Sequence, residues 1–501
     1  MPADEHQRRV IECRARTIRM VAPAGSGKTQ TIVERVLGRI AEGVPPARIL
    51  VLTFDRAART SLVERLASRS RELGIDAAGC TVSTLNAFGA SLLRRHAPGE
   101  AREVVDEARA DALLLGTCAD LGLPQEVAGR GPLVRELFGL LKNALHDPRS
   151  GNVRAFARFL ARDPVAAERL AELEADVPGI DPSTIAALFA AVDRGMRRAG
   201  VLDFDDQKLR ALALLEDAAL GRRIEGLWSE VVVDEFQDIN RLDFELVRRL
   251  AARADLVVTG DDDQAIYGFR GCSSEFIVGL AGHLGREVDS HELAVNYRNP
   301  PNLLAHAVRL VEHNRGRIPK SPVAARTDPA RVSVAAAGGP ESESEGLAHR
   351  VRKAIFGGRR PRDLAVLCRT NAHCAALAER LSAAGVPCRV RADSCGTDAR
   401  GDGSSPPNSS SQRESPSQRD GSADAVTVAT YFRAKGLQWP VVFLPGCNEG
   451  LVPHPRAAVD AERRLFYVAL TRASHELVAS WVAVPRGEAR PSPFLEEAGL
   501  L

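Results

Sequence analysis

The sequence predicts an α/β protein with parallel sheets and a long helical block inserted in its first half. Two observations carry this prediction. Short apolar, β-branched runs alternate along the chain with segments whose apolar residues recur at helical spacing, which is typical of parallel sheets. Residues 98–200 instead are rich in Ala, Leu, Glu and Arg at helical spacing, with few strand signals. The expected strands include Ile49–Phe54, Val231–Val233, Leu256–Gly260, Leu364–Cys368 and Val441–Leu444.

Length and composition limit the classes of protein to consider. The 501 residues suffice for about two to four domains, and the net charge of +2 means that any nucleic-acid surface must be local. The nine cysteines form no C-x-x-C pair, which indicates a reducing compartment and argues against a structural zinc. No signal region or membrane-spanning run is evident. We therefore expect a cytoplasmic protein without a membrane partner.

A glycine-rich turn lies between the first expected strand and helix, Ile18–Val21 and Thr31–Leu37. It matches the pattern Ala/Gly-x-x-x-x-Gly-Lys-Ser/Thr. Such a turn points backbone N–H groups at phosphate oxygens, at the N-terminus of the helix. The residues expected to bind phosphate are Ala22, Gly25, Ser26, Gly27, Lys28 and Thr29. With Lys28 at the β- and γ-phosphates and Thr29 on Mg²⁺, the turn predicts a nucleoside triphosphate site.

An acidic pair follows the buried run Val231–Val233, where a parallel sheet presents its chemistry. Asp234 is expected to hold Mg²⁺, and Glu235 to orient and deprotonate an attacking water. An acidic pair after a strand can also be only a solvated turn or a helix cap. The phosphate-binding turn upstream favours the catalytic interpretation.

The run Leu256–Gly260 repeats this arrangement and leads into Asp261, Asp262 and Gln264. We expect Gln264 to contact the γ-phosphate through its amide, and the two aspartates to support the metal from its second shell of ligands.

Aromatic and basic residues follow this turn: Tyr267, Phe269 and Arg270. Flat rings stack on any nucleobase and an arginine holds a backbone phosphate, which suits single-stranded nucleic acid. Tyr267 fits a core position equally well, whereas Phe269 stands in polar company.

Two distant segments supply further arginines, Arg298 in Asn296–Arg298 and Arg472 in Glu462–Ala473. Positive charge on the γ-phosphate stabilises the transition state of hydrolysis, and one arginine can contribute about 10³–10⁵-fold in rate. Taken alone, each arginine is more simply a surface residue or an ion pair. The functional interpretation depends on the whole set of motifs.

Taken in order, these motifs resemble the superfamily 1A DNA helicases of the UvrD/Rep/PcrA type. Six blocks match: Ala22–Thr29, Asp234–Asp238, Gly260–Gly271, Asn296–Arg298, Ala434–Leu437 and Arg463–Ala473. The segments Leu202–Asp206 and Leu364–Asn371 also resemble family elements. The resemblance implies two RecA-like P-loop NTPase cores, with ATP between them and single-stranded DNA across their tops.

The resemblance also implies roles for individual residues. Gln7 would contact the adenine, and Gln264, Arg298 and Arg472 would sense the γ-phosphate. A looser match, Thr53–Ala58, adds two residues to the DNA-binding set. That set is Phe54, Arg56, Tyr267, Phe269 and Arg270.

The resemblance implies a division of the chain into four parts. We expect a first core, 1A, at 1–97 and 201–290, a 1B-like helical insertion at 98–200, and a second core, 2A, at 291–393 and 423–501. The Ser/Pro-rich stretch 394–422 is expected to be a disordered linker in place of the family's 2B subdomain. Phe432, Gln438 and Asn86 depart from the family's usual residues, but none removes a catalytic group of the ATPase.

The expected function is that of an ATP- and Mg²⁺-dependent 3′→5′ DNA helicase or translocase in DNA repair or replication. Its expected partners are single-stranded DNA, junctions of single- and double-stranded DNA, and a protein that replaces regulation by 2B. One alternative is a translocase that strips proteins from DNA and unwinds poorly without a partner. Another is a nucleotide-dependent DNA-binding switch, against which the intact set of Glu235, Gln264, Arg298 and Arg472 argues.

Overall fold

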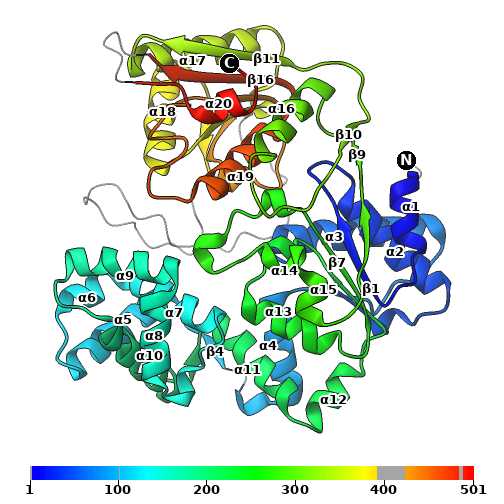
Figure 1. Ribbon diagram of the computed structural model, residues 1–501, viewed down its shortest axis with the longest axis vertical. Coiled ribbons are helices and arrows are strands. Elements are labelled where there is room, and N and C mark those ends of the chain that lie inside the picture. The colour runs from blue at the N-terminus through cyan, green and yellow to red at the C-terminus, as the bar shows by residue number, and fades with distance from the viewer. Residues whose placement is uncertain (1–2, 101, 392–423, 484–488) are drawn as a thin grey trace. The chain divides into compact units, whose positions relative to one another are not determined.

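The computed structural model describes residues 3–100, 102–391, 424–483 and 489–501, and it divides into two compact units (Figure 1). Unit 1 contains Met1–Ala294 and Ile318–Lys320, and unit 2 contains Val295–Arg317 and Ser321–Leu501. The expected linker at 394–422 lies outside the described residues, so the absence of 2B stays a prediction. No helix in the described ranges is both long and apolar enough to cross a membrane.

Unit 1 is built on a six-stranded parallel sheet in the order β3-β2-β6-β7-β1-β8. Its strands are β1 Thr17–Val21, β2 Ile49–Thr53, β3 Thr81–Thr84, β6 Glu230–Val233, β7 Asp255–Gly260 and β8 Asp289–Glu292. Every residue of β2 and β6 is buried, because helices cover both faces of the sheet. This confirms the strands predicted from continuous apolar runs.

Alternate side chains of the strands point to opposite faces of this sheet and pack into two separate cores. One face packs against α1 Glu5–Glu12, α2 Lys28–Ala41 and α3 Arg56–Leu73 through residues such as Ile49 and Val51. The other face uses Leu50 and Leu52. It packs against α4 Leu85–His96, α11 Phe204–Glu216, α12 Leu220–Glu225, α13 Arg241–Leu250, α14 Glu275–Val278 and α15 Leu280–Leu284.

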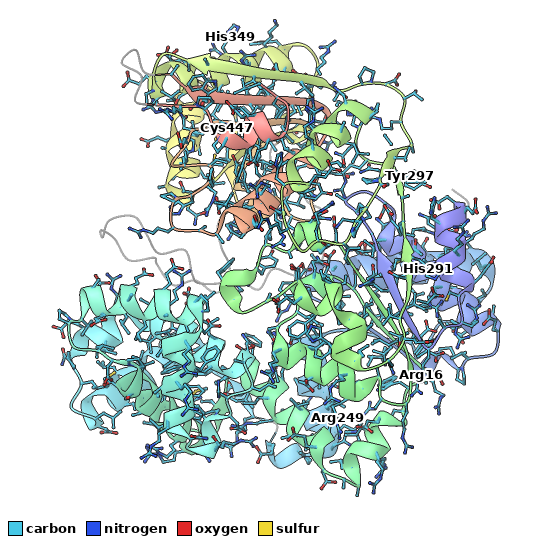
Figure 2. All side chains as sticks on the ribbon, in the orientation of Figure 1. Arg16, Arg249, His291, Tyr297, His349 and Cys447 are labelled. Atoms are coloured by element: carbon cyan, nitrogen blue, oxygen red, sulfur yellow. The ribbon has the colours of Figure 1, made fainter. Side chains whose placement is uncertain are left out.

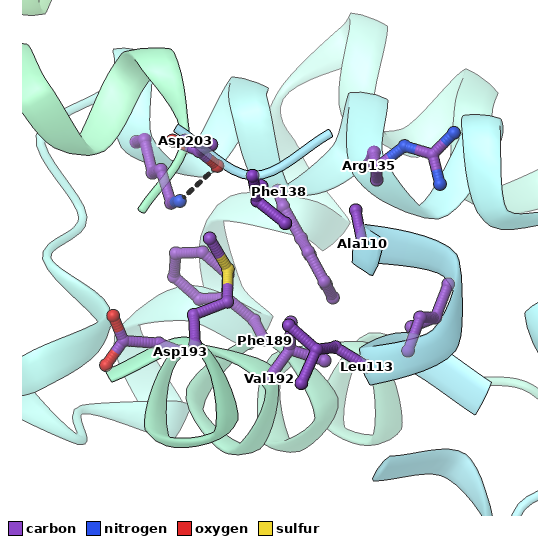
Figure 3. Close-up of a pocket in the computed structure, with 12 residues that line it drawn as sticks. Ala110, Leu113, Arg135, Phe138, Phe189, Val192, Asp193 and Asp203 are labelled. Atoms are coloured by element: carbon purple, nitrogen blue, oxygen red, sulfur yellow. Dashed lines mark hydrogen bonds and ion pairs between the residues drawn. The ribbon is translucent and has the colours of Figure 1, made fainter. Parts of the chain in front are cut away.

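Six helices between β4 Glu103–Val104 and β5 Val201–Leu202 form a separate core within unit 1. They are α5 Glu107–Asp120, α6 Gln125–Gly129, α7 Gly131–Asn143, α8 Val153–Arg162, α9 Pro164–Asp176 and α10 Pro182–Arg198. A cavity of about 70 Å³ lies among α5, α7 and α10, lined mainly by apolar side chains such as Leu113, Phe138 and Phe189 (Figure 3). It is too small for a nucleotide, because ligand pockets usually hold about 300–1,000 Å³.

Unit 2 contains a second six-stranded parallel sheet in the order β11-β16-β15-β12-β14-β13. Its strands are β11 Arg331–Ala337, β12 Leu364–Cys368, β13 Cys388–Val390, β14 Val426–Thr430, β15 Trp439–Leu444 and β16 Ala473–Val482. Its helices are α16 Pro301–Val311, α17 Pro340–Phe356, α18 Asn371–Ala383, α19 Val459–Leu470 and α20 Pro493–Glu497, and the short strands β9 Val295–Asn296 and β10 Val323–Ala324 pair separately. Side chains fill the interior, where Cys447 is fully buried (Figure 2). Two parallel sheets confirm the predicted fold class.

Candidate nucleotide and nucleic-acid site

The glycine-rich turn joins β1 directly to α2, as predicted. Gly25 and Gly27 adopt φ values of 77° and 82°, a left-handed backbone that a side chain would strain. The N–H of Ala22 donates to the carbonyl of Gly260 at 2.9 Å, which fixes the turn beside the end of β7. The N-terminus of α2, which begins at Lys28, therefore faces the turn and favours an anion there.

Gln7 lies against this turn although it comes from a different helix. Its amide Nε2 donates to the carbonyl of Ser26 at 3.2 Å, and both residues are buried. The Ser26 hydroxyl is buried without a hydrogen-bond partner among the described residues. A buried polar group of this kind ordinarily has a partner, so the turn fits an added polar ligand.

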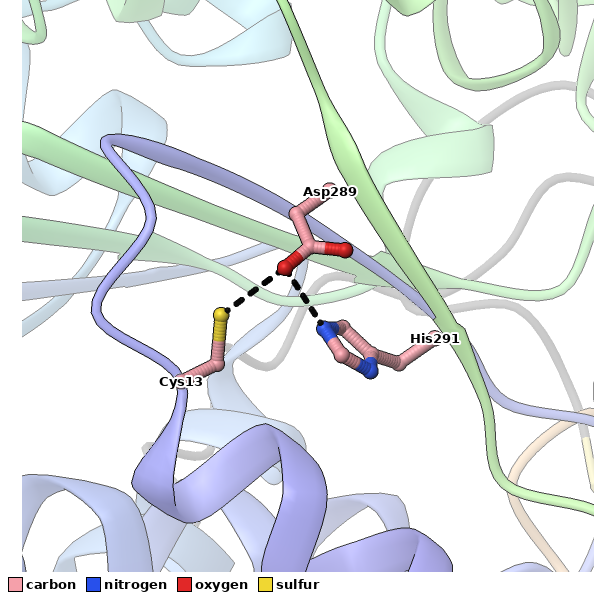
Figure 4. Close-up of side chains that lie close together, drawn as sticks. All are labelled: Cys13, Asp289 and His291. Carbon is pink, nitrogen blue, oxygen red and sulfur yellow. Dashed lines mark hydrogen bonds and ion pairs between the residues drawn. The ribbon is translucent and has the colours of Figure 1, made fainter.

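A cluster at the end of α1 fastens this helix to the sheet (Figure 4). The Cys13 thiol donates to Asp289 Oδ2 at 3.2 Å, and His291 Nε2 lies 3.2 Å from the same oxygen. Burial, together with Asp289, raises the pKa of the Cys13 thiol. The cluster thereby holds α1, which carries Gln7, against the edge strand β8. The expectation that the chain lacks a structural zinc stays a prediction.

One ammonium and two carboxylates converge on the turn. Lys28 Nζ contacts Glu235 Oε1 and lies 3.3 Å from Asp234 Oδ1. Burial raises the pKa of Asp234 to about 6, although the charge of Lys28 opposes the shift. Burial also disfavours the charge of Lys28, but Asp234 and Glu235 outweigh it and raise the pKa of Lys28. Such a set can exchange its internal ion pairs for a phosphate and a divalent cation.

The backbone of Glu235 adopts φ 54°, one of two left-handed non-glycine positions among the described residues. Backbone strain of this kind persists only where the surroundings hold it, and it clusters at functional sites. The N–H of Glu235 donates to Asp234 Oδ1 at 2.9 Å. Gln237, in the short helix Phe236–Asp238, donates from Nε2 to Glu235 Oε2 at 2.5 Å. These contacts hold the Glu235 carboxylate next to Lys28.

Gln237 also connects Glu235 to the turn after β7, a role that no local sequence pattern indicates. Its Oε1 accepts the N–H of Asp261 at 3.1 Å, and Gln264 Nε2 donates to Asp261 Oδ2 at 2.7 Å. Glu235 and Gln264 are therefore linked through two buried side chains. Asp261 and Asp262 form ion pairs with Lys320, and the expectation that they support a metal stays a prediction.

Aromatic side chains that follow β2 and β7 meet at the carboxyl ends of these strands. The rings of Phe54 and Tyr267 stack with centroids 5.3 Å apart and planes 17° from parallel. The ring of Phe269 lies 6.2 Å from that of Tyr267, and the Arg270 guanidinium lies 5.7 and 5.5 Å from these two rings. Burial raises the pKa of Tyr267. The predicted DNA-binding aromatics thus form one cluster, and Arg56 is exposed at the start of α3.

The two expected γ-phosphate arginines belong to unit 2. Asn299 donates to the carbonyls of Thr471 and Ala473 at 3.1 and 2.8 Å, which brings the segments of Arg298 and Arg472 together. Arg472 is buried, and its guanidinium donates to Val468 O at 2.8 Å. It also donates to Leu437 O at 3.1 Å and to Thr471 Oγ1 at 2.9 Å. The catalytic roles of both arginines stay predictions.

Family models match most of the chain. The model of the UvrD/REP helicase N-terminal domain matches residues 3–284, and that of the UvrD-like helicase C-terminal domain matches 291–394 and 408–483. The chain belongs to the UvrD-like helicase family. This membership accounts for the order of the motifs and for the two parallel sheets.

Curated relatives of this UvrD-like helicase chain cover it to different extents. The ATP-dependent DNA helicase UvrD2 of Mycobacterium tuberculosis is 27% identical over 98% of this chain and 81% of its own length. DNA helicase II of Escherichia coli is 26% identical over 77% of this chain and 51% of its own length. The ATP-dependent DNA helicase PcrA of Staphylococcus aureus is 25% identical over 74% of this chain and 48% of its own length.

Gly260 is the position where the contact between Gln237 and the turn leaves no space for a side chain. A Cβ there would lie 2.2 Å from Gln237 Oε1 and 3.2 Å from the backbone N of Gln237. We expect Gly260→Ala to displace the Gln237 amide, to lower stability by about 1–3 kcal/mol and to reduce ATP turnover. Thermal unfolding and steady-state ATPase rates measure both effects.

Gly116→Ala is the matched control for this substitution. Gly116 lies within α5, and a Cβ there would meet nothing within 4 Å. Alanine favours a helix over glycine by about 0.5–1 kcal/mol, so this variant should be as stable as the parent or more so. If Gly260→Ala behaved like Gly116→Ala, the tight packing of Gln237 against β7 would be refuted.

Proposed function

We propose that this UvrD-like helicase chain hydrolyses Mg²⁺-bound ATP and uses the energy to move 3′→5′ along single-stranded DNA, in DNA repair or replication. The observation that carries the proposal is that, within unit 1, the residues around the glycine-rich turn are connected to the aromatic cluster. A hydrogen-bonded path runs from Glu235 through Gln237 and Asp261 to Gln264. The same segment of chain continues directly into the aromatic cluster at Tyr267 and Phe269.

The chemistry proposed for the first set is activation of water beside the γ-phosphate. A γ-phosphate competes with Glu235 for the Lys28 ammonium, and Glu235 then accepts the proton of the attacking water. Thr29 and Asp234 would hold Mg²⁺, which neutralises charge on the phosphate oxygens. Gln7 would contact the adenine. Arg298 and Arg472 would add positive charge from unit 2.

The aromatic cluster is proposed to stack on bases, while Arg56 and Arg270 hold backbone phosphates. Base stacking on a protein aromatic contributes about 1–3 kcal/mol, so Phe54→Ala and Phe269→Ala should each weaken oligo(dT) binding about 5- to 150-fold. Fluorescence anisotropy measures this affinity. Phe356→Ala is the control, because Phe356 is 89% exposed at the end of α17 in unit 2 and should have no effect. Equal affinities for all three variants would contradict the proposed DNA site.

The test of the proposed function is unwinding of duplexes that carry a 3′ or a 5′ single-stranded tail. We expect ATP-dependent strand separation from the 3′-tailed junction and little from the 5′-tailed one. If DNA stimulated turnover but neither duplex opened, a translocase that depends on a protein partner would be favoured. Efficient opening of the 5′-tailed duplex alone would contradict the proposed direction of movement.

A further inference from the structure

Three consecutive aspartates after β7 are buried together. The side chains of Asp261, Asp262 and Asp263 are 1%, 1% and 2% exposed. Adjacent carboxylates repel one another, and burial removes the water that would screen them. Burial, with repulsion from Asp263 and Asp261, raises the pKa of Asp262 even though a lysine opposes the shift. A cluster of this kind requires a buried cation to hold it.

Lys320 supplies this cation. Its ammonium lies 3.1 Å from Asp261 Oδ1 and 2.7 Å from Asp263 Oδ2, and it also contacts Asp262 Oδ1. An ammonium has three N–H donors, so it can serve each carboxylate once. The backbone N–H of Ile318 donates to Asp262 Oδ2 at 2.9 Å, which adds a second contact from the same segment.

The segment that contains Lys320 is bounded on both sides by chain of unit 2. Ile318–Lys320 belong to unit 1, whereas the chain before them, Val295–Arg317, and after them, from Ser321, belongs to unit 2. Lys320 is therefore covalently continuous with unit 2 on both sides. A change in the course of that chain would therefore act on the ammonium and on the aspartates that it holds.

Asp261 links Lys320 to the groups proposed to act on ATP. One of its carboxylate oxygens faces Lys320, and the other accepts the Gln264 amide at 2.7 Å. Its backbone N–H donates to Gln237, which in turn donates to Glu235. The contacts form one continuous path from the Lys320 segment to Gln264 and Glu235.

We propose that Lys320 is a positioning residue that holds the Asp261–Gln264 turn, so that binding of a γ-phosphate at Gln264 is coupled to the course of the chain through unit 2. This inference rests on the proposed ATPase function and deepens it. As a positioning residue, Lys320 is expected to contact neither ATP nor DNA. It acts through Asp261, which orients the Gln264 amide.

The test compares Lys320→Gln with the parent in two measurements. The first is the ratio of the dissociation constants for ADP and for the non-hydrolysable β,γ-imido analogue of ATP, which reports γ-phosphate sensing. The second is the stimulation of ATP turnover by oligo(dT). We expect Lys320→Gln to reduce both by at least about fivefold, the lower end of usual coupling between sites. ADP affinity itself should stay the same.

Lys208→Gln is the matched control. Lys208, on α11, is also a buried lysine between aspartates, with Nζ 2.9 Å from Asp243 Oδ1 and 3.2 Å from Asp205 Oδ1. Its loss should lower the melting temperature but leave the nucleotide ratio and the DNA stimulation intact. If Lys320→Gln does not fold, the double variant Lys320→Gln/Asp262→Asn removes one negative charge together with the cation. This double variant should fold and should still show the reduced nucleotide ratio and the reduced stimulation by DNA.

The outcomes separate this inference from the proposed function. Lys320→Gln, or the double variant, with the parent's nucleotide ratio and DNA stimulation would overturn the inference and leave Lys320 as a stabilising residue only. A parent protein that binds both nucleotides but shows no turnover with DNA would overturn the proposed function. The nucleotide ratio would still test Lys320 in that case, because it requires no hydrolysis.

Discussion

Glu235→Gln is expected to lower ATP turnover by about 10²–10⁴-fold, the usual contribution of a positioned general base, while ATP still binds. The substitution keeps the size of the side chain but removes its capacity to accept a proton. Lys28 contacts one oxygen of Glu235 and Gln237 contacts the other, so both carboxylate oxygens are held in place in the parent protein. Steady-state ATPase rates and the affinity for a fluorescent ATP analogue measure the two parts of the prediction.

Glu245→Gln provides the comparison for that result. Glu245 lies on α13, where it forms an ion pair with Arg248 at 2.7 Å, and it should tolerate the change without loss of turnover. A Glu235→Gln variant that retained more than about a tenth of the parent's turnover would be inconsistent with its role as the base.

Lys28→Ala is expected to weaken ATP binding about 10- to 100-fold, because hydrogen bonds to charged groups contribute about 1.5–3 kcal/mol. Turnover should also be lost, because the γ-phosphate would lack its ammonium. The variant would in addition leave Asp234 and Glu235 without their shared cation, so their mutual repulsion should raise the pKa of Asp234 further. Titration calorimetry with ATP measures the affinity.

The control for this substitution is Lys353→Ala. Lys353 is exposed on α17 in unit 2, so removing its charge should change neither ATP affinity nor turnover. If Lys28→Ala bound ATP as tightly as Lys353→Ala, the glycine-rich turn would not be the phosphate site.

The strands and the phosphate-binding turn could be predicted because their signals are local. Buried parallel strands are continuous apolar runs, as at Val231–Val233, and the turn places its glycines at the two positions that need a left-handed backbone. The acidic pair Asp234–Glu235 could be predicted because it comes directly after the apolar run that forms β6. The aromatic cluster was predicted as a set, although only the structure shows that Phe54 stacks on Tyr267.

Long-range side-chain contacts could not be predicted in this way. Gln237 and Asp261 are 24 positions apart, and Lys320 and Asp262 are 58 apart, so no local pattern relates them. The ion pairs of Asp261 and Asp262 with Lys320 were therefore not predicted. One indirect signal exists in the rarity of lysine. Of the six lysines, Lys142, Lys208 and Lys320 are each buried against two or three aspartates, where a compact ammonium differs from a guanidinium.

ATP turnover by the whole chain, measured with and without oligo(dT), tests most directly whether the proposed ATP site and the aromatic cluster are coupled. Gln237, Asp261 and Gln264 join the proposed ATP site to the aromatic cluster, so binding of DNA at the cluster should change the rate of ATP hydrolysis. We predict that oligo(dT) raises turnover at least about fivefold, and that a blunt duplex of the same length does so far less. Turnover that is the same with oligo(dT), with the blunt duplex and without DNA would contradict this coupling.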